Sequence, residues 1–483
     1  MKQFVISFLL TILLSMVGTR VWAWDFEVDG IYYNVVSIDD LTCEIAPEDG
    51  SRSYYRGDFT IPSVVQYKGK ELKVVQIGQN AFAFCTGLTS VTIPEGITRI
   101  GNNAFSGCKY LVSVQIPSTV KSIGSNVFYN CNSLVSIVLP KIMDSIGLQA
   151  FAYCTSLKQI TIPNGVTSIQ EFTFQGCSSL VDISISQSVR NIEKSAFEEC
   201  TALENINMPD GLEIIGESAF KGCTALKEFT VPSSCNEIRD YAFNGCTSLV
   251  NLIIKDGDAD TEPLIFGYSF LRNNNAHYYA ELFSGSNLET LYLGRITKSY
   301  KLDSSVYYRS YSNDGIFGKN LKSITIGNNI TDDIYNSAVN YFFEKQGGSL
   351  YERTTPYYRH ITFGRGIKTI PDLSFNRLDS IVVINDNPPS ARNFSNMTFI
   401  DGKLYVPKGC KEIYASAPVW KNFWNIYELE QDIYSSGINV QENNIKRSEV
   451  SRYTIGGALI KNPQKGVNII KMGDGAVKKV VVK

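Results

Sequence analysis

Histidine is the scarcest chemically versatile residue in this 483-residue chain, which contains only His277 and His360. Metal sites and acid–base catalysis both rely heavily on histidine, so the composition disfavours enzymes and metal centres of that kind. The sequence also lacks a Gly-x-Ser-x-Gly elbow, a phosphate-binding loop and a His-Glu-x-x-His helix. We therefore expect a protein that is not an enzyme and that binds no metal and no cofactor.

An excess of one charge is also missing, because 45 Lys and Arg residues balance 47 Asp and Glu residues. This balance gives no reason to expect nucleic acid as a partner. Only 19% of residues are charged and 44% are hydrophobic, which is enough apolar material to exclude a disordered chain. Acidic pairs such as Asp256 and Asp258 supply too few oxygens for a calcium site.

Long hydrophobic runs are absent too, since no stretch reaches the roughly 18 apolar residues of a membrane-spanning helix. Residues 1–23 have the pattern of a secretory signal peptide instead. Lys2 supplies the positive charge, residues 4–17 form a short apolar run, and Ala23 is a small residue for cleavage. We expect an exported protein with no transmembrane anchor after cleavage; an uncleaved membrane anchor is the alternative.

A repeat of 23 residues dominates the chain. Phe stands three residues before each repeating cysteine, and Leu stands three residues after it. Four invariant columns over eight units, counting an Ile eight residues before each cysteine, indicate a solenoid. The repeating cysteines are Cys85, Cys108, Cys131, Cys154, Cys177, Cys200, Cys223 and Cys246.

Within one unit, apolar residues alternate as in a short strand. Leu88, Val91 and Ile93 are followed by Pro94, which lacks the donor needed to continue the ladder. A single unit cannot bury these side chains, so successive units must stack with like residues about 4.8 Å apart, forming ladders of Phe, Leu, Ile and Cys. The predicted fold class is a mainly β repeat solenoid with parallel strands.

The unit, written Ile-Gly-x-x-Ala-Phe-x-x-Cys-x-x-Leu-x-x-Val-x-Ile-Pro, resembles the BspA-type leucine-rich repeat of bacterial and protist surface proteins. The resemblance implies a right-handed coil, a location in the secreted fraction or at the bacterial cell surface, and a role in adhesion and protein binding. Residues 288–294, 321–327 and 360–384 repeat the strand pattern loosely. Residues 404–429 resemble a C-terminal cap, in which Trp420 and Trp424 are expected to cover the last strand.

The chain ends in a basic segment of different character. Residues 446–483 carry nine basic and two acidic residues, a net charge of +7, and predict strands at 452–460, 467–472 and 477–482. The segment resembles C-terminal sorting modules of type IX secretion, through residues 453–457, 465–470 and 478–483. It departs from them at Ala458, where such modules usually carry Arg.

Together these patterns predict six parts. They are a signal peptide at 1–23, an N-terminal cap with a first interrupted repeat at 24–69, regular repeats at 70–255, divergent repeats with a Tyr-rich insertion at 256–400, a C-terminal cap at 401–432, and a linker with a small β tail at 433–483.

The cysteines admit two interpretations. Export makes disulfides conceivable, and stacked units would bring equivalent cysteines within bridging range. A cysteine that recurs beside Phe and Leu in every unit, however, behaves as a small apolar core residue. Cys235 occupies a position where other units carry Ile, Val or Leu, which supports the same interpretation. We favour buried, reduced thiols.

Two surfaces are candidates for binding. The first consists of outward strand positions, which are polar and carry little charge; the alternative is an ordinary solvated face. The second is the Tyr-rich insertion, since Tyr dominates recognition loops, although inserted loops also need aromatic residues for packing. The candidate binding residues are Thr92, Gln115, Thr161, Ser184, Asn207, Thr230, Tyr278, Tyr279, Tyr307, Tyr308 and Tyr311.

We therefore expect a non-catalytic, adhesin-like binding protein, which is a monomer and recognises an extracellular protein or glycan. A self-associating structural surface protein is the alternative, and a surface-acting hydrolase is a third. Arg56-Gly57-Asp58 spells an integrin-recognised tripeptide, but such a triplet arises readily by chance in a chain of this length.

Overall fold

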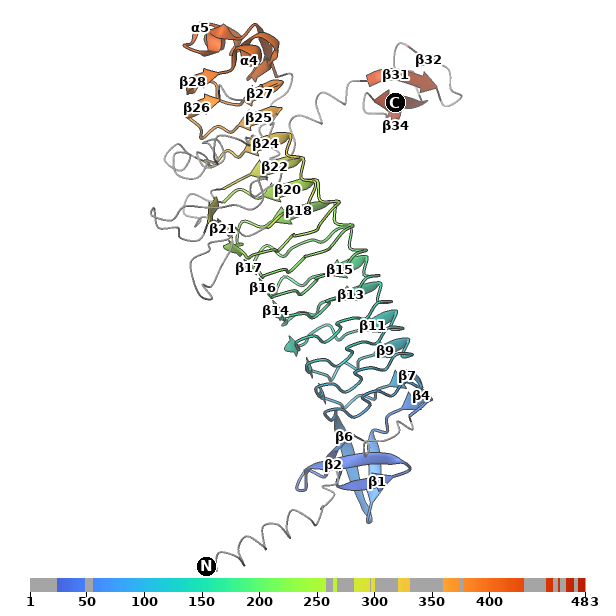
Figure 1. Cartoon of the computed structure of the whole chain (residues 1–483). Helices are drawn as coiled ribbons and strands as arrows, with labels where there is room; N and C mark the ends of the chain where they lie inside the picture. The colour runs from blue at the N-terminus through green and yellow to red at the C-terminus, as the bar shows by residue number, and fades with distance from the viewer. Residues whose placement is uncertain are drawn as a thin grey trace, which may run out of the picture. The chain divides into compact units, whose positions relative to one another are not determined.

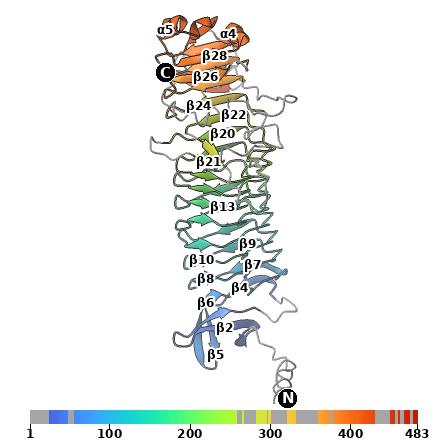
Figure 2. The same cartoon turned by 60° about the vertical axis from the view of Figure 1, so that its left-hand side comes forward.

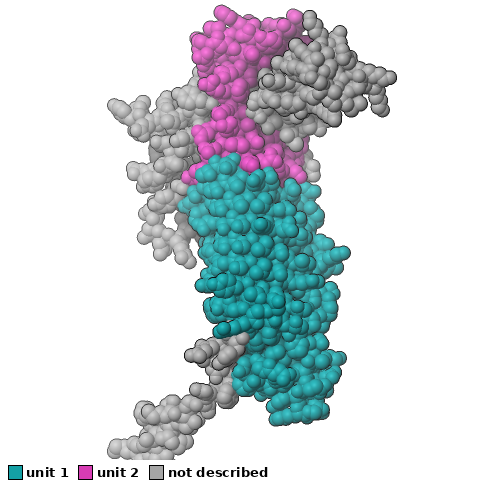
Figure 3. Space-filling view, turned by 90° about the vertical axis from the view of Figure 1, so that its right-hand side faces the viewer, with its two compact units in different colours: residues 1–226, 238–248 teal, residues 227–237, 249–483 magenta. Residues whose placement is uncertain are grey.

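The structure is a computed structural model that describes residues 24–47, 55–257, 264–266, 282–295, 297–299, 320–330, 359–373, 377–429 and four strands between 449 and 482. It contains two compact units (Figure 3). Unit 1 comprises residues 1–226 and 238–248, and unit 2 comprises residues 227–237 and 249–483. Short parallel strands stacked coil upon coil make up most of the described chain, which is the predicted mainly β leucine-rich-repeat solenoid (Figure 1).

Unit 1 begins with a small sheet that covers the first coil. The hairpin strands β1 (Phe26–Val28), β2 (Ile31–Ser37) and β3 (Thr42–Ile45) pair antiparallel, and β3 then pairs in parallel with β6 (Lys70–Ile77). β5 (Val64–Tyr67) pairs antiparallel with β6. The sheet packs its aromatic residues together and closes the apolar end of the repeats, as a terminal cap must.

Most coils of unit 1 contribute one strand to each of two parallel ladders (Figure 2). The first ladder contains β4 (Gly57–Thr60), β7 (Leu88–Thr92), β9 (Ser113–Gln115), β11 (Ser136–Val138), β13 (Gln159–Thr161) and β15 (Asp182–Ser184). The second continues from β6 through β8 (Arg99–Ile100), β10 (Ser122–Ile123) and β12 (Ser145–Ile146). Strands β14 (Ser168–Ile169), β16 (Asn191–Ile192) and β17 (Ile214–Ile215) pair in the same register. β19 (Glu237–Ile238) lies at a boundary between the units.

The predicted core ladders are confirmed. Neighbouring Phe rings from Phe82 to Phe243 stack nearly parallel, with centroids 5.1–5.5 Å apart. Each repeating cysteine from Cys108 to Cys246, which leaves out Cys235, donates its thiol to the Phe carbonyl of the preceding coil, at 3.1–3.2 Å. All eleven cysteines are buried free thiols, so the predicted burial is confirmed.

The turn around each Phe needs left-handed backbone at two places. The position five residues before each cysteine has a positive φ in every regular coil, and so has the position one residue before it. Asn and Gly occupy many of these places because they tolerate that conformation best. Glu199 is an exception, with φ 59° where neighbouring coils carry Gly176 and Gly222.

Unit 2 is built on one eight-stranded parallel sheet. Its strands in spatial order are β18 (Glu228–Val231), β20 (Asn251–Ile254), β22 (Thr290–Leu293), β24 (Ser323–Ile326), β25 (His360–Phe363), β27 (Ser380–Val383), β29 (Lys403–Val406) and β30 (Asn425–Glu428). β21 (Leu264–Phe266) pairs with β23 (Thr297–Ser299), and β26 (Thr369–Leu373) pairs with β28 (Ser390–Phe394). The divergent repeats predicted at 288–294, 321–327 and 360–384 are therefore genuine coils.

Three short helices close the C-terminal end of this sheet: α4 (Asn396–Asp401), α5 (Lys411–Ser416) and the 3₁₀ turn η2 (Trp420–Asn422). Trp420 is buried and donates to the carbonyl of Pro389 at 2.7 Å, as a cap residue should. The prediction for Trp424 is wrong, because its side chain is 73% exposed. Phe423 takes the inner place instead, in contact with Phe394 and Phe399.

The tail forms a separate antiparallel sheet of four strands: β31 (Glu449–Thr454), β32 (Leu459–Ile460), β33 (Gly466–Met472) and β34 (Val477–Val482). The strands predicted at 467–472 and 477–482 are confirmed. The single strand predicted at 452–460 is wrong, since β31 and β32 pair antiparallel with each other. Gly456 and Gly457 between them are residues that permit such a reversal.

Candidate functional site

The outward side chains of the first ladder form a continuous face on unit 1, which we call the strand face. Strand alternation produces it, because β9, β13 and β15 each bury their central residue and expose the residues on both sides. Pairing in register aligns these side chains, with Thr92 opposite Gln115 and Thr161 opposite Ser184. The strand face comprises Thr92, Ser113, Gln115, Ser136, Val138, Gln159, Thr161, Asp182 and Ser184, all exposed.

Hydroxyl and amide groups give this face its chemistry, and Asp182 is its one charged residue. Among the described residues, no side chain of the strand face forms a hydrogen bond to another side chain. Their donors and acceptors therefore point to solvent from neighbouring coils. Such a surface offers many weak, neutral hydrogen bonds rather than one strong charged contact.

An apolar spot lies within the strand face. Val138 is 62% exposed between Gln115 and Thr161, where the neighbouring coils carry polar residues. Val112, Val135 and Val181 are also exposed, each directly before the strand of its coil. Consecutive backbones bond directly here, with Val135 N 2.9 Å from Val112 O. The face can thus bury some apolar area while its polar groups bind.

The predicted site residues fall into three groups. Thr92, Gln115, Thr161 and Ser184 lie together on the strand face. Asn207 is exposed but belongs to a stretch, 203–209, to which no strand is assigned, and Thr230 is a half-buried residue of β18 in unit 2. The remaining predictions lie outside the described residues: Tyr278, Tyr279, Tyr307, Tyr308 and Tyr311.

The Arg-Gly-Asp triplet lies at the edge of the strand face, with Gly57 and Asp58 on β4 and Arg56 directly before it. The Asp58 carboxylate accepts hydrogen bonds from Ser90 at 2.6 Å and from Thr89 at 3.1 Å. These bonds lower the pKa of Asp58. The carboxylate is thus held by its own sheet, which is an ordinary structural role for this residue.

The sheet of unit 2 presents a different surface. Three of its outward side chains, those of Tyr292, Thr362 and Val382, are buried, whereas Thr325 and Tyr405 on the strands between and beside them are half-buried. Tyr292 donates to both carboxylate oxygens of Asp256, at 3.0 and 2.9 Å, and burial raises the pKa of that carboxyl group. His360 is half-buried, with Nδ1 2.9 Å from Ser380 Oγ, and burial lowers its pKa. These groups hold the sheet together rather than face solvent.

A hollow of about 570 Å³ opens at the start of the unit 2 strands. Its walls combine charged and amide side chains with a similar share of apolar surface. Asn320 Nδ2 donates to Asn287 Oδ1 at 3.0 Å, and Lys322 Nζ lies 2.5 Å from Glu289 Oε1. Sequence reasoning missed this hollow. It is lined by Val250, Asn287, Glu289, Asn320, Leu321, Lys322 and Arg359.

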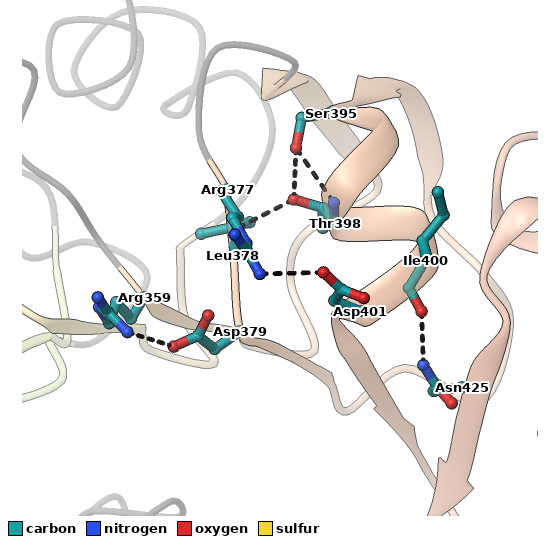
Figure 4. A network of polar contacts seen from close by, with 9 residues as sticks. All are labelled: Arg359, Arg377, Leu378, Asp379, Ser395, Thr398, Ile400, Asp401 and Asn425. Carbon is teal, nitrogen blue, oxygen red and sulfur yellow. Dashed lines mark hydrogen bonds and ion pairs between the residues drawn. The ribbon is translucent and has the colours of Figure 1, made fainter.

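Arg359 pairs with Asp379 at 3.1 Å, and a polar network stabilises the segment that carries Asp379 (Figure 4). The Thr398 hydroxyl of α4 accepts a hydrogen bond from the backbone of Leu378 at 2.9 Å, and Arg377 pairs with Asp401. The acidic partner of Arg359 is therefore anchored to the cap of the sheet rather than to a free loop.

No group of three or more His, Cys, Asp or Glu side chains suited to a metal ion occurs within the described ranges. In the same part of the chain, no helix is long and apolar enough to span a membrane. His277 and Asp258 lie outside the described residues.

The comparison with family models matches the repeats that build the strand face and the first coils of unit 2. Six copies of the BspA-type leucine-rich repeat region match within residues 75–204, 144–272 and 191–314. Residues 75–314 are a BspA-type leucine-rich repeat region. The BspA-type repeats therefore include the strand face and extend into the first coils of unit 2.

Several solved leucine-rich repeat proteins are similar to the chain. One from T. pallidum is 29% identical over 42% of this chain and 90% of its own, with a TM-score of 0.36. One from Bacteroides ovatus is 26% identical over 84% and 100%, with a TM-score of 0.45. A leucine-rich cell surface protein from Faecalibacterium prausnitzii is 21% identical over 84% and 95%, with a TM-score of 0.39. No curated protein matches the chain.

Proposed function

We propose that this protein is a non-catalytic, adhesin-like binding protein, secreted or displayed at a bacterial surface, whose strand face recognises an extracellular protein or glycan. One observation carries the proposal: hydroxyl and amide groups of successive coils lie exposed, in register and free of side-chain partners on the described face. The apolar spot around Val138 adds burial energy to such contacts.

Affinity in this arrangement comes from many modest contacts. A neutral hydrogen bond contributes roughly 1 kcal/mol, so the loss of one side chain weakens binding only a few-fold. A ligand that spans several coils would gain from the sum of these contacts. In this proposal the Tyr-rich segment is a second region that contacts the ligand. The basic tail is a sorting signal for export.

The test is a screen of the protein from Trp24 onward against matrix proteins and glycans in physiological salt. We expect a saturable hit. The variant Gln115→Lys/Thr161→Lys/Ser184→Lys should weaken that hit at least tenfold, because long charged side chains obstruct a neutral face.

A matched control places the same three charges on other exposed positions of unit 1, as Thr98→Lys/Ser145→Lys/Thr167→Lys. This control should bind like the original protein. Equal binding by both variants would place the ligand elsewhere on the molecule. A folded protein without any ligand on the screen would count against a binding function.

A further inference from the structure

Four charged residues follow one another at the start of the unit 2 strands, and we call them the charged column: Glu289, Lys322, Arg359 and Asp379. Their backbones bond in this order. Lys322 N lies 2.8 Å from Glu289 O, Arg359 N lies 2.9 Å from Lys322 O, and Asp379 N lies 2.7 Å from Arg359 O. The two cationic residues, Lys322 and Arg359, are therefore neighbours. Glu289 flanks Lys322 and Asp379 flanks Arg359.

Each cation is bound on its outer side. Glu289 holds Lys322 at 2.5 Å, and Asp379 holds Arg359 at 3.1 Å. An ammonium group has three donors and a guanidinium group has five, so most donors remain available after these contacts. Both side chains are more than half exposed, at 56% and 65%. The space between them suits an anion that accepts from both.

The rest of the hollow adds a second kind of contact. The amides of Asn287 and Asn320, which bond to each other at 3.0 Å, line the same hollow as the two cations, and Val250 and Leu321 supply apolar wall. Pockets of a few hundred Å³ with a few convergent polar groups are typical of small-ligand sites. Amide groups donate and accept, which suits ligand hydroxyls, whereas a bare inorganic anion would use only the cations.

We propose that this hollow binds an anionic sugar, with its carboxylate or sulfate group between Lys322 and Arg359 and its hydroxyl groups on Asn287 and Asn320. The inference rests on the proposed binding function and gives unit 2 a ligand class of its own. The outer carboxylates position the cations and also compete with the ligand for them.

Calorimetry on the full chain from Trp24 onward would test this with four probes: a hyaluronan hexasaccharide, sulfated maltohexaose, neutral maltohexaose and hexaglutamate. The first two carry a carboxylate and a sulfate, so their comparison tells which anion the site prefers. We expect at least one of them to bind, about tenfold or more tightly than the neutral sugar and hexaglutamate. Equal binding of the neutral sugar, or of hexaglutamate, would overturn the proposal.

Substitutions locate the site. Lys322→Gln and Arg359→Gln should each weaken binding about tenfold, whereas Lys158→Gln should change it less than about twofold. Lys158 is a matched control, because it holds the same position in its coil on unit 1 but lies between Val135 and Val181. Equal effects of Lys158→Gln and Lys322→Gln would contradict a dedicated site.

Glu289→Gln distinguishes an anion site from a merely structural ion pair. Removing the competing carboxylate should tighten binding about threefold, and unchanged or weaker binding would contradict the proposal. The same variants belong on the matrix and glycan screen. A hit that survives Lys322→Gln/Arg359→Gln, with no binding of the anionic probes, would end this proposal and leave the binding function standing.

Discussion

The two units contain the same parallel ladder but use its outer side in opposite ways. In unit 1 the coils repeat every 23 residues and the strand face is open to solvent. In unit 2 several of the equivalent side chains, including Tyr292, Thr362 and Val382, are buried. Bonded residues on neighbouring coils there stand 39, 33 or 20 positions apart.

This difference shows which part of the repeat is essential. The strands of unit 2 keep buried apolar residues at alternate positions, such as Leu291 and Leu293 or Ile324 and Ile326, while the chain between strands varies in length. Longer connections cost little extra entropy when their ends are fixed by a sheet. The regular 23-residue spacing therefore depends on connections of equal length. The parallel ladder still forms when the connections differ in length.

The largest expected difference between the units appears at alkaline pH. Burial raises the pKa of Cys131, Cys177 and Cys246 to about 12, whereas an unfolded thiol has a pKa near 8.5. The unfolded state therefore releases protons first. The stability from neutral buried thiols is complete below about pH 8.5 and is lost as pH rises toward 12, by up to about 1.4 kcal/mol per pH unit for each thiol.

We expect unit 1, which contains the whole cysteine column, to lose protection in hydrogen exchange between pH 9 and 11 before unit 2 does. The variant Cys154→Ala/Cys177→Ala should show a shallower pH dependence than the original protein. An unchanged pH dependence would mean that the thiols do not drive the loss. A thiol count in denaturant checks the starting state and should approach eleven.

The next largest effect concerns the aromatic ladder. Phe151 is fully buried between Phe128 and Phe174, so Phe151→Ala should lower the free energy of unfolding by about 3–5 kcal/mol. Tyr405→Ala in unit 2 removes a half-buried ring that stacks on Tyr427, and should cost about 1 kcal/mol. Denaturant titrations of both variants measure this. If both variants lost a similar free energy of unfolding, a ring in the regular Phe stack would contribute no more to stability than the Tyr405–Tyr427 pair.

The smallest effect is a gain. Glu199 adopts φ 59°, and the neighbouring coils carry glycine at the same place. Glu199→Gly relieves a left-handed backbone and should raise the stability of unit 1 by about 0.5 kcal/mol. Gly222→Glu at the equivalent position of the next coil should lower it by a similar amount. A loss of stability in Glu199→Gly would show that its side chain matters more than its backbone.

Periodic features of the fold could be predicted from the sequence, because a spacing of 23 residues puts the same residue type at the same position of each regular coil. The Phe and Cys columns, the outward direction of Thr92 and Gln115 and the divergent strands all follow from such rules. Trp424 could not be placed in this way, since Phe423 beside it competes for the same apolar cluster.

The hollow in unit 2 escaped sequence reasoning for a related reason. Lys322 and Arg359 are 37 residues apart, and only strand pairing makes them neighbours. One signal was available: four successive coils of unit 2 carry a charged residue just before the strand, namely Glu289, Lys322, Arg359 and Asp379, whereas several coils of unit 1 carry Val112, Val135 or Val181 at this position. Comparing coils column by column would have shown this change of charge.

The most direct test of a free recognition face is light scattering on the protein from Trp24 onward, alone and with the ligand that the screen identifies. The account predicts the mass of one chain without ligand, and a defined complex with ligand that the Gln115→Lys/Thr161→Lys/Ser184→Lys variant fails to form. Large species without ligand, dispersed by the same three substitutions, would contradict it and identify the strand face as a surface for self-assembly.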